Sequence, residues 1–515
     1  MTRRTLLLVS AIAIAACAPA NAPVAPPPTT ATTSAEDNPT QTPLRFLLIN
    51  DVYFGDTLRD GTAGLARVAA LRDSLSRTGG PVIFVLAGDF MSPSLLSKWY
   101  RGEQMREQLN AAKVDLVTFG NHEFELDKDT LVARIAGSRA KWTSANCMLA
   151  DGNPFAGVSK WNTTTINGVK VGVFGVTLVG DYRRYVKCSN PDSAAHDAIR
   201  NLKVAGAQIV YGLTHQTLLA DSILLAREPD LDFILGGHEH ENHRILVGQK
   251  RLLKADANSR SAQLLSLTHT PNGWVQGDRL ILIDKSLPFD PATQAVVKSW
   301  NDSVAKRMGA ERVIATTTFA LDGRDVANRA RESPLGDVVT DAVRFGTGAD
   351  AAIMNAGTMR IDDVIPPGPI TNYQLESIFL FPDETKIMTF PIKGARLRTI
   401  LERGVSEAAV GKGAYLQVSG LKYSWDRSKP SGSRIVGNIT KTDGTVIGPN
   451  DTIRLSFNAY PACEGGDGYT VPEAKSACDA RASAPRAVDL VMKHVTERLG
   501  GRVEPPPAGR VTPIN

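Results

Sequence analysis

Five short apolar runs in the N-terminal half of the chain each end in polar side chains of the kinds that bind metals. Short apolar runs interrupted by glycine are typical of buried strands. In sheets of this kind the loops that leave the carboxyl ends of the strands build the functional site, so we expect the five ends to converge. Asp, Asn and His suit divalent transition metals, and several together suit a two-metal site. The runs and their ends are Phe46–Ile49 with Asn50-Asp51, Val82–Ala87 with Gly88-Asp89, Val114–Phe119 with Gly120-Asn121-His122-Glu123, Ile209–Leu213 with Thr214-His215, and Leu231–Leu235 with Gly236-Gly237-His238-Glu239-His240.

Two of these ends are more specific than the other three. A single Gly-Asp or a single His after a strand is common in ordinary turns and loops. In Gly120-Asn121-His122-Glu123 the glycine allows a tight turn while consecutive polar side chains point into a site. In His238-Glu239-His240 the two imidazoles stand two residues apart, so an extended segment places them on the same side.

The hydrophobic pattern predicts two folded parts joined by a helix. Residues 43–285 alternate apolar runs with helical patterns such as Leu65–Arg77, which predicts a layered α/β domain. In the linker 286–315, a helix over Pro291–Met308 has Asp290 as its N-cap. A second domain is expected at 316–515. Its candidate elements are helices at Pro334–Phe345 and Ser483–Leu499 and strands at Ala349–Met354, Ile387–Pro391 and Leu416–Trp425.

The beginning of the chain has the pattern of a targeting segment. Arg3-Arg4 followed by the apolar stretch Leu6–Ala16 is typical of a secretory signal and also weakly resembles a twin-arginine signal. Ile14-Ala15-Ala16-Cys17 resembles a bacterial lipobox, which predicts a signal peptide at 1–17 and lipidation of Cys17. Ordinary cleavage after Ala20-Asn21-Ala22 is the alternative.

Residues 18–42 are rich in Pro, Ala and Thr, which favours a flexible tether. We therefore expect an exported protein of the bacterial cell envelope or periplasm that meets the membrane only through an N-terminal lipid anchor. An oxidising compartment permits disulfides. The short spacing of Cys463 and Cys478 predicts one, whereas Cys147 and Cys188 form either a second disulfide or two free buried thiols.

Composition limits the classes of partner. A hydrophobic content of 43% and a charged content of 22% are ordinary for a globular protein, and 515 residues are enough for two domains. The net charge of +5 is small for this length, and no basic run or basic stripe interleaved with aromatics stands out. The sequence therefore predicts no nucleic-acid partner, and it leaves the oligomeric state open.

The order Asp, Gly-Asp, Gly-Asn-His-Glu, His and Gly-His-x-His resembles the calcineurin-like metallophosphoesterases. Because the likeness continues into the second half, the chain most resembles the 5′-nucleotidase family. The resemblance implies a four-layer αββα sandwich with a second, smaller α/β C-terminal domain. It also implies two divalent metal ions (Mn, Zn, Fe or Co). The implied ligands are Asp89 as the bridge, Asn121, His215 and His238 on the second metal, and Asp51, His240 and the residue at position 53 on the first.

Position 53 departs from the family pattern, because Asp51-Val52-Tyr53 stands where the family has Asp-x-His. Three interpretations compete. Tyr53 can ligate as a phenolate, which a hard trivalent iron would favour; it can hold a ligand or water without touching the metal; or the first metal can bind weakly. By resemblance, His122 stabilises the phosphoryl transition state or protonates the leaving group, and Glu125 replaces the family's Asp as the residue that orients it. Glu123 has a structural interpretation only.

Three segments of the second half resemble the family's substrate-binding domain. They are Arg331-Glu332-Ser333-Pro334-Leu335-Gly336-Asp337, Asn355-Ala356-Gly357-Thr358-Met359-Arg360 and Gly465-Gly466-Asp467-Gly468-Tyr469. The resemblance implies that Arg331 and Arg360 bind phosphate, with Asn355 nearby, and that Asp467 accepts a hydrogen bond from a ribose hydroxyl. Asp383 stands where the family places one aromatic ring of a base clamp, and Tyr460 is the candidate for the other.

Three functions follow in order of preference. The first is an exported, metal-dependent phosphomonoesterase that hydrolyses nucleoside 5′-phosphates to nucleoside and phosphate. The second keeps the hydrolase but changes its small-molecule substrate to UDP-sugars, cyclic nucleotides, sugar phosphates or sulfur esters, and Asp383 motivates it. The third is a metal-impaired surface binding protein, motivated by Tyr53 and Glu125.

Overall fold

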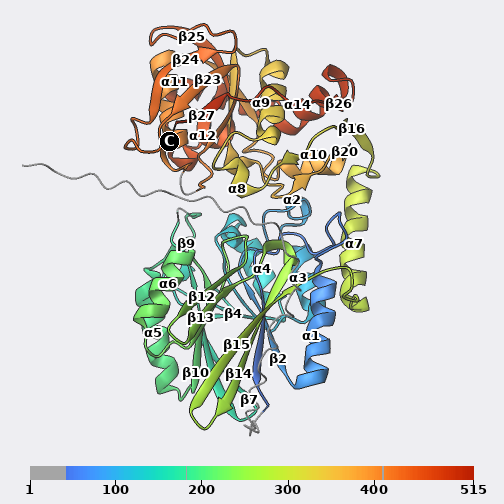
Figure 1. The fold of residues 1–515 in the computed structure, drawn as a ribbon, viewed down its shortest axis with the longest axis vertical. Helices are drawn as coiled ribbons and strands as arrows, with labels where there is room; N and C mark the ends of the chain where they lie inside the picture. The colour runs from blue at the N-terminus through green and yellow to red at the C-terminus, as the bar shows by residue number, and fades with distance from the viewer. Residues whose placement is uncertain (1–41, 181, 409–410, 515) are drawn as a thin grey trace, which may run out of the picture.

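The computed structural model describes residues 42–180, 182–408 and 411–514. The predicted signal peptide with Cys17, and the predicted tether up to residue 41, lie outside the described residues. Figure 1 shows two folded bodies stacked along the long axis, with helix α7 (Pro291–Met308) running beside them. The predicted bounds of α7 are confirmed, and the Asp290 carboxylate caps it by accepting a hydrogen bond from the Thr293 N–H at 2.8 Å.

Two sheets form the centre of the N-terminal domain. Their central strands, among them Leu44–Ile49 and Ile209–His215, are buried on both faces, which is why they read as continuous apolar runs. The first sheet has the order β15 (Gly273–Leu282), β14 (Ser261–Thr270), β1 (Leu44–Ile49), β2 (Val82–Ala87), β3 (Leu116–Thr118), β4 (Lys141–Thr143) and β6 (Val158–Ser159). The second has the order β12 (His243–Val247), β13 (Lys250–Lys254), β11 (Phe233–Gly236), β10 (Ile209–His215), β8 (Val169–Thr177) and β7 (Trp161–Ile166).

The two sheets pack face to face, and helices cover their outer faces. Between the sheets, the ring of Phe46 lies 5.1 Å from those of Tyr211 and Phe233. On the outer face of the first sheet lie α1 (Leu65–Gly79), α3 (Glu103–Ala112) and α4 (Lys128–Ala136), and on that of the second lie α5 (Pro191–Val204) and α6 (Leu218–Arg227). These are the four layers of the predicted αββα sandwich, which is confirmed.

A single large apolar core holds the smaller C-terminal α/β domain together. Its central sheet has the order β21 (Ile387–Lys393), β25 (Thr452–Asn458), β18 (Ala351–Asn355) and β22 (Leu416–Ser419). Smaller sheets contain β24 (Ile435–Lys441), β23 (Leu421–Trp425) and β27 (Val511–Pro513); β20 (Gly368–Thr371), β16 (Val313–Thr317) and β26 (Arg502–Val503); and β17 (Leu321–Asp322) with β19 (Val364–Ile365). The helices include α8 (Asp325–Asn328), α9 (Pro334–Thr347), α10 (Asn372–Ile378), α11 (Gly394–Ser406), α12 (Ala459–Cys463) and α14 (Ala487–Lys493).

Two expected elements of this domain are wrong in detail. Leu416–Trp425 is not one strand, because the chain turns at Gly420 (φ 82°) and enters a second sheet. A Cβ atom at Gly420 would lie 2.3 Å from the carbonyl oxygen of Asp350, so only glycine fits there. The closing helix expected at Ser483–Leu499 begins later: α14 spans Ala487–Lys493 and continues as a π-helix over His494–Arg498.

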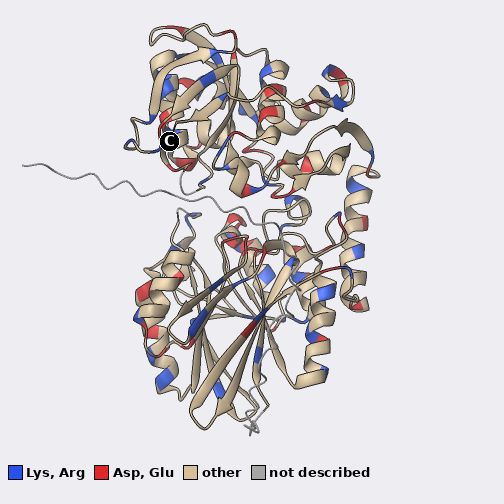
Figure 2. Cartoon of the chain, in the orientation of Figure 1, with Lys and Arg blue, Asp and Glu red and all other residues tan. Residues whose placement is uncertain are grey.

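The domains touch through side chains of α2 (Ser97–Tyr100) and α10. The ammonium group of Lys98 bonds the carboxylate of Glu376, and the two side chains are only 4% and 9% exposed. Figure 2 shows that Lys and Arg are interspersed with Asp and Glu over both domains. Among the described residues, no helix combines the length and apolar character that crossing a membrane requires.

The structure contains two disulfides. Cys463–Cys478 was predicted. For Cys147 and Cys188 the disulfide is the correct alternative, and it joins the paired strands β5 (Cys147–Leu149) and β9 (Val186–Cys188).

Candidate metal centre and substrate cleft

The five predicted strand ends meet at one edge of the sandwich. Asp51 follows β1, Asp89 follows β2, Asn121 follows β3, and His215 is the last residue of β10. His238 and His240, which follow β11, complete the candidate set. Because β1, β2 and β3 run parallel, as do β8, β10 and β11, the carboxyl ends of both sheets lie at the same edge.

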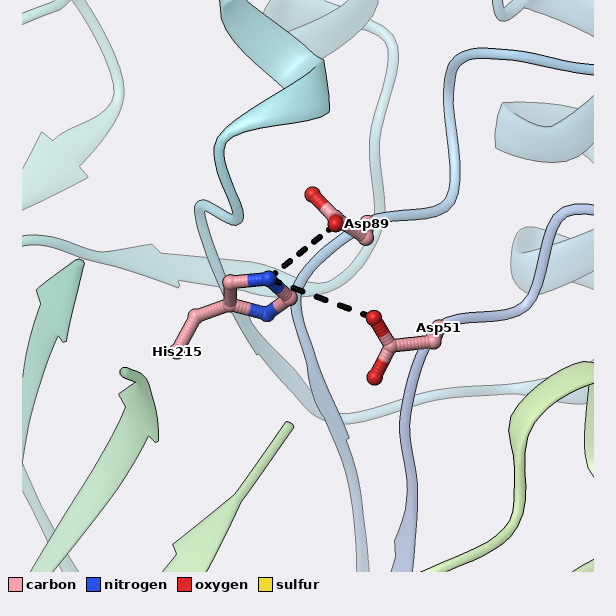
Figure 3. A group of neighbouring side chains, drawn as sticks. All are labelled: Asp51, Asp89 and His215. Carbon is pink, nitrogen blue, oxygen red and sulfur yellow. Dashed lines mark ion pairs between the residues drawn. The ribbon is translucent and has the colours of Figure 1, made fainter. Parts of the chain in front are cut away.

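Two carboxylates and an imidazole form the buried centre of this group (Figure 3). His215 Nε2 lies 3.1 Å from Asp89 Oδ2 and 3.9 Å from Asp51 Oδ1, and all three side chains are at most 2% exposed. His240 Nε2 lies 3.7 Å from Asp51 Oδ1. The rings of His215 and His238 are 5.4 Å apart, and the N–H of His238 donates to Asp51 Oδ2 at 2.9 Å.

The backbone at the strand ends is held in an uncommon conformation. Asp51, Asp89 and His238 have φ values of 52°, 56° and 86°, a region that side chains other than glycine rarely adopt. Glycine is needed beside them: a Cβ atom at Gly88 would lie 2.5 Å from the backbone nitrogen of Gly120 and 2.6 Å from the His215 ring. These turns aim the polar side chains inward at close quarters.

Glu123 holds two of these turns together through its carboxylate, as its structural interpretation predicts. Its Oε2 accepts the N–H groups of Asp89 (2.9 Å) and Gly120 (2.6 Å), and its Oε1 accepts those of Phe90 (2.8 Å) and Met91 (3.0 Å). The side chain is completely buried. The carboxylate therefore fixes the loops that carry Asp89 and Asn121.

The donor set fits a metal site. Asp51 Oδ1, Asn121 Oδ1 and His215 Nε2 are buried and have no hydrogen-bond partner, which is costly for polar atoms unless a cation binds them. The Nδ1 of His215 lies 2.8 Å from the carbonyl oxygen of Ala87, which can only accept. Nδ1 therefore carries the proton, and the lone pair of Nε2 faces the carboxylates.

Electrostatics in this cluster favour a positive charge. Burial opposes protonation of His215, but the charges of Asp89 and Asp51 outweigh it and raise the His215 pKa to about 10. Burial favours the neutral form of Asp89, yet the charge of His215 holds the Asp89 pKa below its usual range. Burial and then the charge of His215 lower the pKa of His238 to about 3. The two carboxylates therefore favour a cation beside them.

Tyr53 lies among these groups as a hydrogen-bonding side chain. Its hydroxyl donates to Asp89 Oδ2 at 3.0 Å and lies 3.3 Å from His240 Nε2. Burial, and then the charge of Asp89, raise the Tyr53 pKa well above its usual range, which favours a neutral phenol. Tyr53 thus contacts two candidate ligands, Asp89 and His240, and the choice among the three interpretations stays a prediction.

His122 stands beside the cluster, between the carboxylate of Glu125 and the guanidinium of Arg360. Its Nδ1 lies 2.5 Å from Glu125 Oε1, and Arg360 donates to its Nε2 at 3.0 Å. Because a guanidinium only donates, His122 Nε2 accepts this hydrogen bond. The ring proton is then on Nδ1, which donates a hydrogen bond to Glu125. The predicted pairing of His122 with Glu125 is thus present, and Arg360 reaches it from the C-terminal domain.

A cleft of about 1180 Å³ runs from this point between the two domains. The predicted residues that line it are Asn121, His122, Glu125, Asn355, Arg360, Tyr460 and Asp467. Within it, Asn355 Nδ2 donates to Asp467 Oδ2 at 2.6 Å, which joins two of the three C-terminal motifs.

Arg331 is not among the side chains that line the cleft. Its side chain is 66% exposed and its Nη2 lies 3.8 Å from Asp322 Oδ2. Arg329, two residues earlier, lines the cleft instead and pairs with Asp325 at 2.5 Å. In this Arg-Ala-Arg segment the structure thus places Arg329 along the cleft, whereas the sequence predicts Arg331.

The part of the cleft lined by residues 381–384 and Tyr460 contains acids and rings together. Phe381, Asp383, Glu384 and Tyr460 all line it, and the Asp383 side chain is 83% exposed. A Cβ atom at Gly466 would lie 2.4 Å from the Tyr460 ring, so this glycine lets the ring pack against the Gly-Gly-Asp-Gly loop. Tyr460 is thus placed for stacking, whereas Asp383 offers a charge in place of a second ring.

Two protein-family models match the chain. The calcineurin-like phosphoesterase model matches residues 44–242, and the model of the 5′-nucleotidase C-terminal domain matches residues 313–474. The first covers all the candidate metal ligands, and the second covers the segments that line the C-terminal side of the cleft.

The chain is also similar to individual proteins of known sequence or structure. It is 25% identical over 474 residues to endonuclease YhcR of Bacillus subtilis, which covers 83% of this chain but only 38% of that protein. It is 23% identical over 463 residues to a snake venom 5′-nucleotidase of Naja atra, covering 80% and 86% of the two chains. The crystal structure of a 5′-nucleotidase precursor from Thermus thermophilus aligns with a TM-score of 0.79 and 24% identity, over 92% and 99% of the two chains. This last likeness shows a shared two-domain fold.

Proposed function

Because the chain belongs to the 5′-nucleotidase family, with a calcineurin-like phosphoesterase domain joined to a 5′-nucleotidase C-terminal domain, we propose that it hydrolyses nucleoside 5′-phosphates to nucleoside and phosphate. The observation that carries the proposal is that side chains of the two domains meet at His122. Orphaned ligand atoms of the N-terminal domain lie next to His122, and Arg360 of the C-terminal domain bonds that histidine.

The proposed cofactor is a pair of divalent ions drawn from Mn, Zn, Fe and Co. We assign Asp89 as the bridging ligand, Asn121, His215 and His238 to one ion, and Asp51 and His240 to the other. When bound, such a pair supplies charge neutralisation on the phosphoryl oxygens and an activated water.

In this proposal, side chains of the protein bind the phosphate and transfer one proton. Arg360 and Arg329 bind the phosphoryl oxygens, for which the guanidinium fork is well shaped. His122 keeps its Nδ1–H on Glu125. With a second proton on Nε2, it would stabilise the transferring group or give that proton to the leaving 5′-oxygen as the P–O bond breaks, which leaves the neutral ring with Nδ1–H. Arg360 then exchanges its contact with His122 Nε2 for the substrate.

The part of the cleft lined by Tyr460 and Asp467 would bind the nucleoside. Asp467 accepts a hydrogen bond from a ribose hydroxyl, and Asn355, which is hydrogen-bonded to Asp467, holds that carboxylate in place. The base stacks on Tyr460, for which stacking contributes about 1–3 kcal/mol.

A second candidate keeps the chemistry and changes the substrate to a larger or more polar ester, such as a UDP-sugar or a cyclic nucleotide. The specific observation in its favour is Asp383, an acid at the end of the cleft where a second ring is expected. Burial, and then the charges of Glu125 and Glu464, raise the pKa of the adjacent Glu384 to about 7, so this end of the cleft also offers a carboxyl group that hydrogen bonds in either protonation state.

We also propose that the protein is exported. Support comes from the signal-like pattern at the start of the chain and from two disulfides, which persist in oxidising compartments. Lipidation of Cys17 is part of this proposal, and mass spectrometry of the mature N-terminus tests it.

The decisive experiment measures phosphate release by the purified protein from AMP, UDP-glucose, cyclic AMP and a generic aryl phosphate, with Mn, Zn, Fe or Co added. Preference for AMP supports the first proposal, and preference for the other esters supports the second. Asp89→Asn should abolish turnover under both. If no substrate is hydrolysed with any of these metals, the hydrolase proposal is wrong and a surface binding role takes its place.

A further inference from the structure

One ligand of the candidate metal centre is held by a side chain from the other domain. His240 follows β11 in the N-terminal domain, and its Nδ1 lies 2.6 Å from Asp362 Oδ2. Asp362 belongs to the C-terminal domain, 122 residues further along the chain. Both side chains are largely buried, at 18% and 15% exposure, so this contact forms inside the domain interface.

The hydrogen-bond pattern fixes the roles of the atoms. Asp362 Oδ1 accepts the backbone N–H of Asp325 at 3.0 Å, and Oδ2 accepts from His240. Nδ1 of His240 therefore carries the proton, and its Nε2 presents a lone pair 3.7 Å from Asp51 Oδ1. A carboxylate on the far nitrogen of a ligating histidine fixes the ring and its tautomer and makes the ligand more basic.

The segment that carries Asp362 is built to reach across the interface. Asp362 has φ 38°, a backbone conformation that is uncommon for a residue other than glycine. Arg260 of the N-terminal domain donates to the Asp362 carbonyl oxygen and to the Asp363 carboxylate, both at 3.4 Å. The turn is thus anchored on the N-terminal domain by its backbone as well as by its side chain.

We propose that Asp362 is a positioning residue for the metal centre, through which cation binding at Asp51 and His240 is coupled to the contact between the domains. The inference rests on the proposed two-metal function. It requires that cations bind more tightly when the C-terminal domain is in place, and by linkage that bound cations favour the arrangement in which the two domains are in contact.

The sharpest variant is Asp362→Asn, matched with Asp363→Asn. Asn tolerates a positive φ, so the backbone is preserved. Its amide has only one oxygen, however. The Asp325 N–H and the His240 Nδ1–H bond different oxygens of the Asp362 carboxylate, so one of them would face an NH2 group. Asp363→Asn removes the same charge from the neighbouring residue, whose side chain is 40% exposed. An amide oxygen at this position can still accept from Arg260, so this contact between the domains is kept. Asp362→Gly, which removes the acceptor without backbone strain, is the second variant.

The measurement is equilibrium dialysis of the full chain against buffered free Zn²⁺ or Mn²⁺, with bound metal counted by mass spectrometry. Wild type and Asp363→Asn should bind two ions. Asp362→Asn and Asp362→Gly should keep one ion and bind the other about ten- to a hundred-fold more weakly. Equal binding by all four proteins, or an equal loss in Asp363→Asn, would overturn the inference. If wild type itself binds no metal, the proposed function fails instead.

A variant elsewhere in the interface tests the coupling. Glu376→Gln breaks the buried pair with Lys98 and leaves every candidate ligand in place. It should weaken the same ion as Asp362→Asn, and it should add little when combined with Asp362→Asn, because the cation no longer senses the second domain. Unchanged affinity in Glu376→Gln, or full additivity in the double variant, would show that Asp362 acts only locally and would refute the coupling.

Discussion

Replacing Glu123 by Gln tests whether this carboxylate holds the strand-end loops. Its two oxygens each accept two backbone N–H groups. Burial and the charge of Asp89 raise its pKa, but four donors leave no acceptor for a carboxyl proton, so the group is ionised in the fold. In Glu123→Gln one oxygen becomes an NH2 group that faces two N–H donors. Two charge-assisted hydrogen bonds are lost whichever way the amide turns.

The size of the effect follows from those two bonds. Hydrogen bonds to charged groups contribute about 1.5–3 kcal/mol each, so the variant should lose about 3–6 kcal/mol of folding free energy. For a domain of this size, that lowers the melting temperature of the N-terminal domain by about 6–24 °C. The loops of Asp89 and Asn121 are the ones released, so the affinity for divalent cations should fall together with stability.

The assay is thermal and urea unfolding of Glu123→Gln beside Glu125→Gln. Glu125 lies in the same turn and undergoes the same change of charge, but its side chain is 31% exposed and bonds the side chains of His122 and Ser92, not the backbone. Glu125→Gln should change stability by less than about 1 kcal/mol and lower kcat about tenfold or more. A Glu123→Gln protein that melts within about 2 °C of wild type, the shift that about 1 kcal/mol produces, would refute this account of the loops.

Three further predictions can be checked with purified protein. Arg329→Ala should raise the KM for AMP at least about tenfold, as loss of a charged hydrogen bond does, whereas Arg331→Ala should leave it within about twofold; steady-state kinetics compares them. Burial raises the pKa of Asp337 to about 8, above its unfolded value near 4. Between about pH 4 and pH 8 the folded state therefore holds a proton that the unfolded chain releases, and the free energy of unfolding falls as the pH rises through this range. Asp337→Asn should therefore match wild type near pH 4 and be more stable at pH 8, with urea midpoints as the measure. Dialysis against a chelator should lower the melting temperature, because Asp51 and Asp89 lose their counter-ions, and added Zn²⁺ or Mn²⁺ should restore it.

The strands of the N-terminal domain could be predicted because burial on both faces leaves a strong local signal. The predicted run Val82–Ala87 is β2 residue for residue, and the predicted run Phe46–Ile49 lies within β1 and ends at the same residue. Leu416–Trp425 failed because its division depends on the approach of Asp350 to Gly420, a contact between distant segments that no local pattern records. Periodicity thus reports burial well and tertiary turns poorly.

The same limit explains why Arg329, and not the predicted Arg331, lines the cleft. Arg329 and Arg331 stand two residues apart at the end of α8, where the backbone is close to helical, so their side chains point about 200° apart. Only one can face the cleft, and the choice depends on how α8 packs. A motif match fixes a segment to within a turn, but it does not fix which face of that turn meets the substrate.

The role of Asp362 could not be predicted from local sequence either, because it depends on a contact between the two domains. This contact bears on the replacement of the family's histidine by Tyr53. If Tyr53 hydrogen-bonds Asp89 instead of binding a metal, Asp51, Asp89 and His240 are the protein ligands left for the first ion. A site with one imidazole fewer depends more on the orientation of the imidazole it keeps. The carboxylate that orients His240, Asp362, comes from the other domain. The first ion therefore has one imidazole ligand fewer at Tyr53, and the domain interface offsets this loss by holding His240 in place.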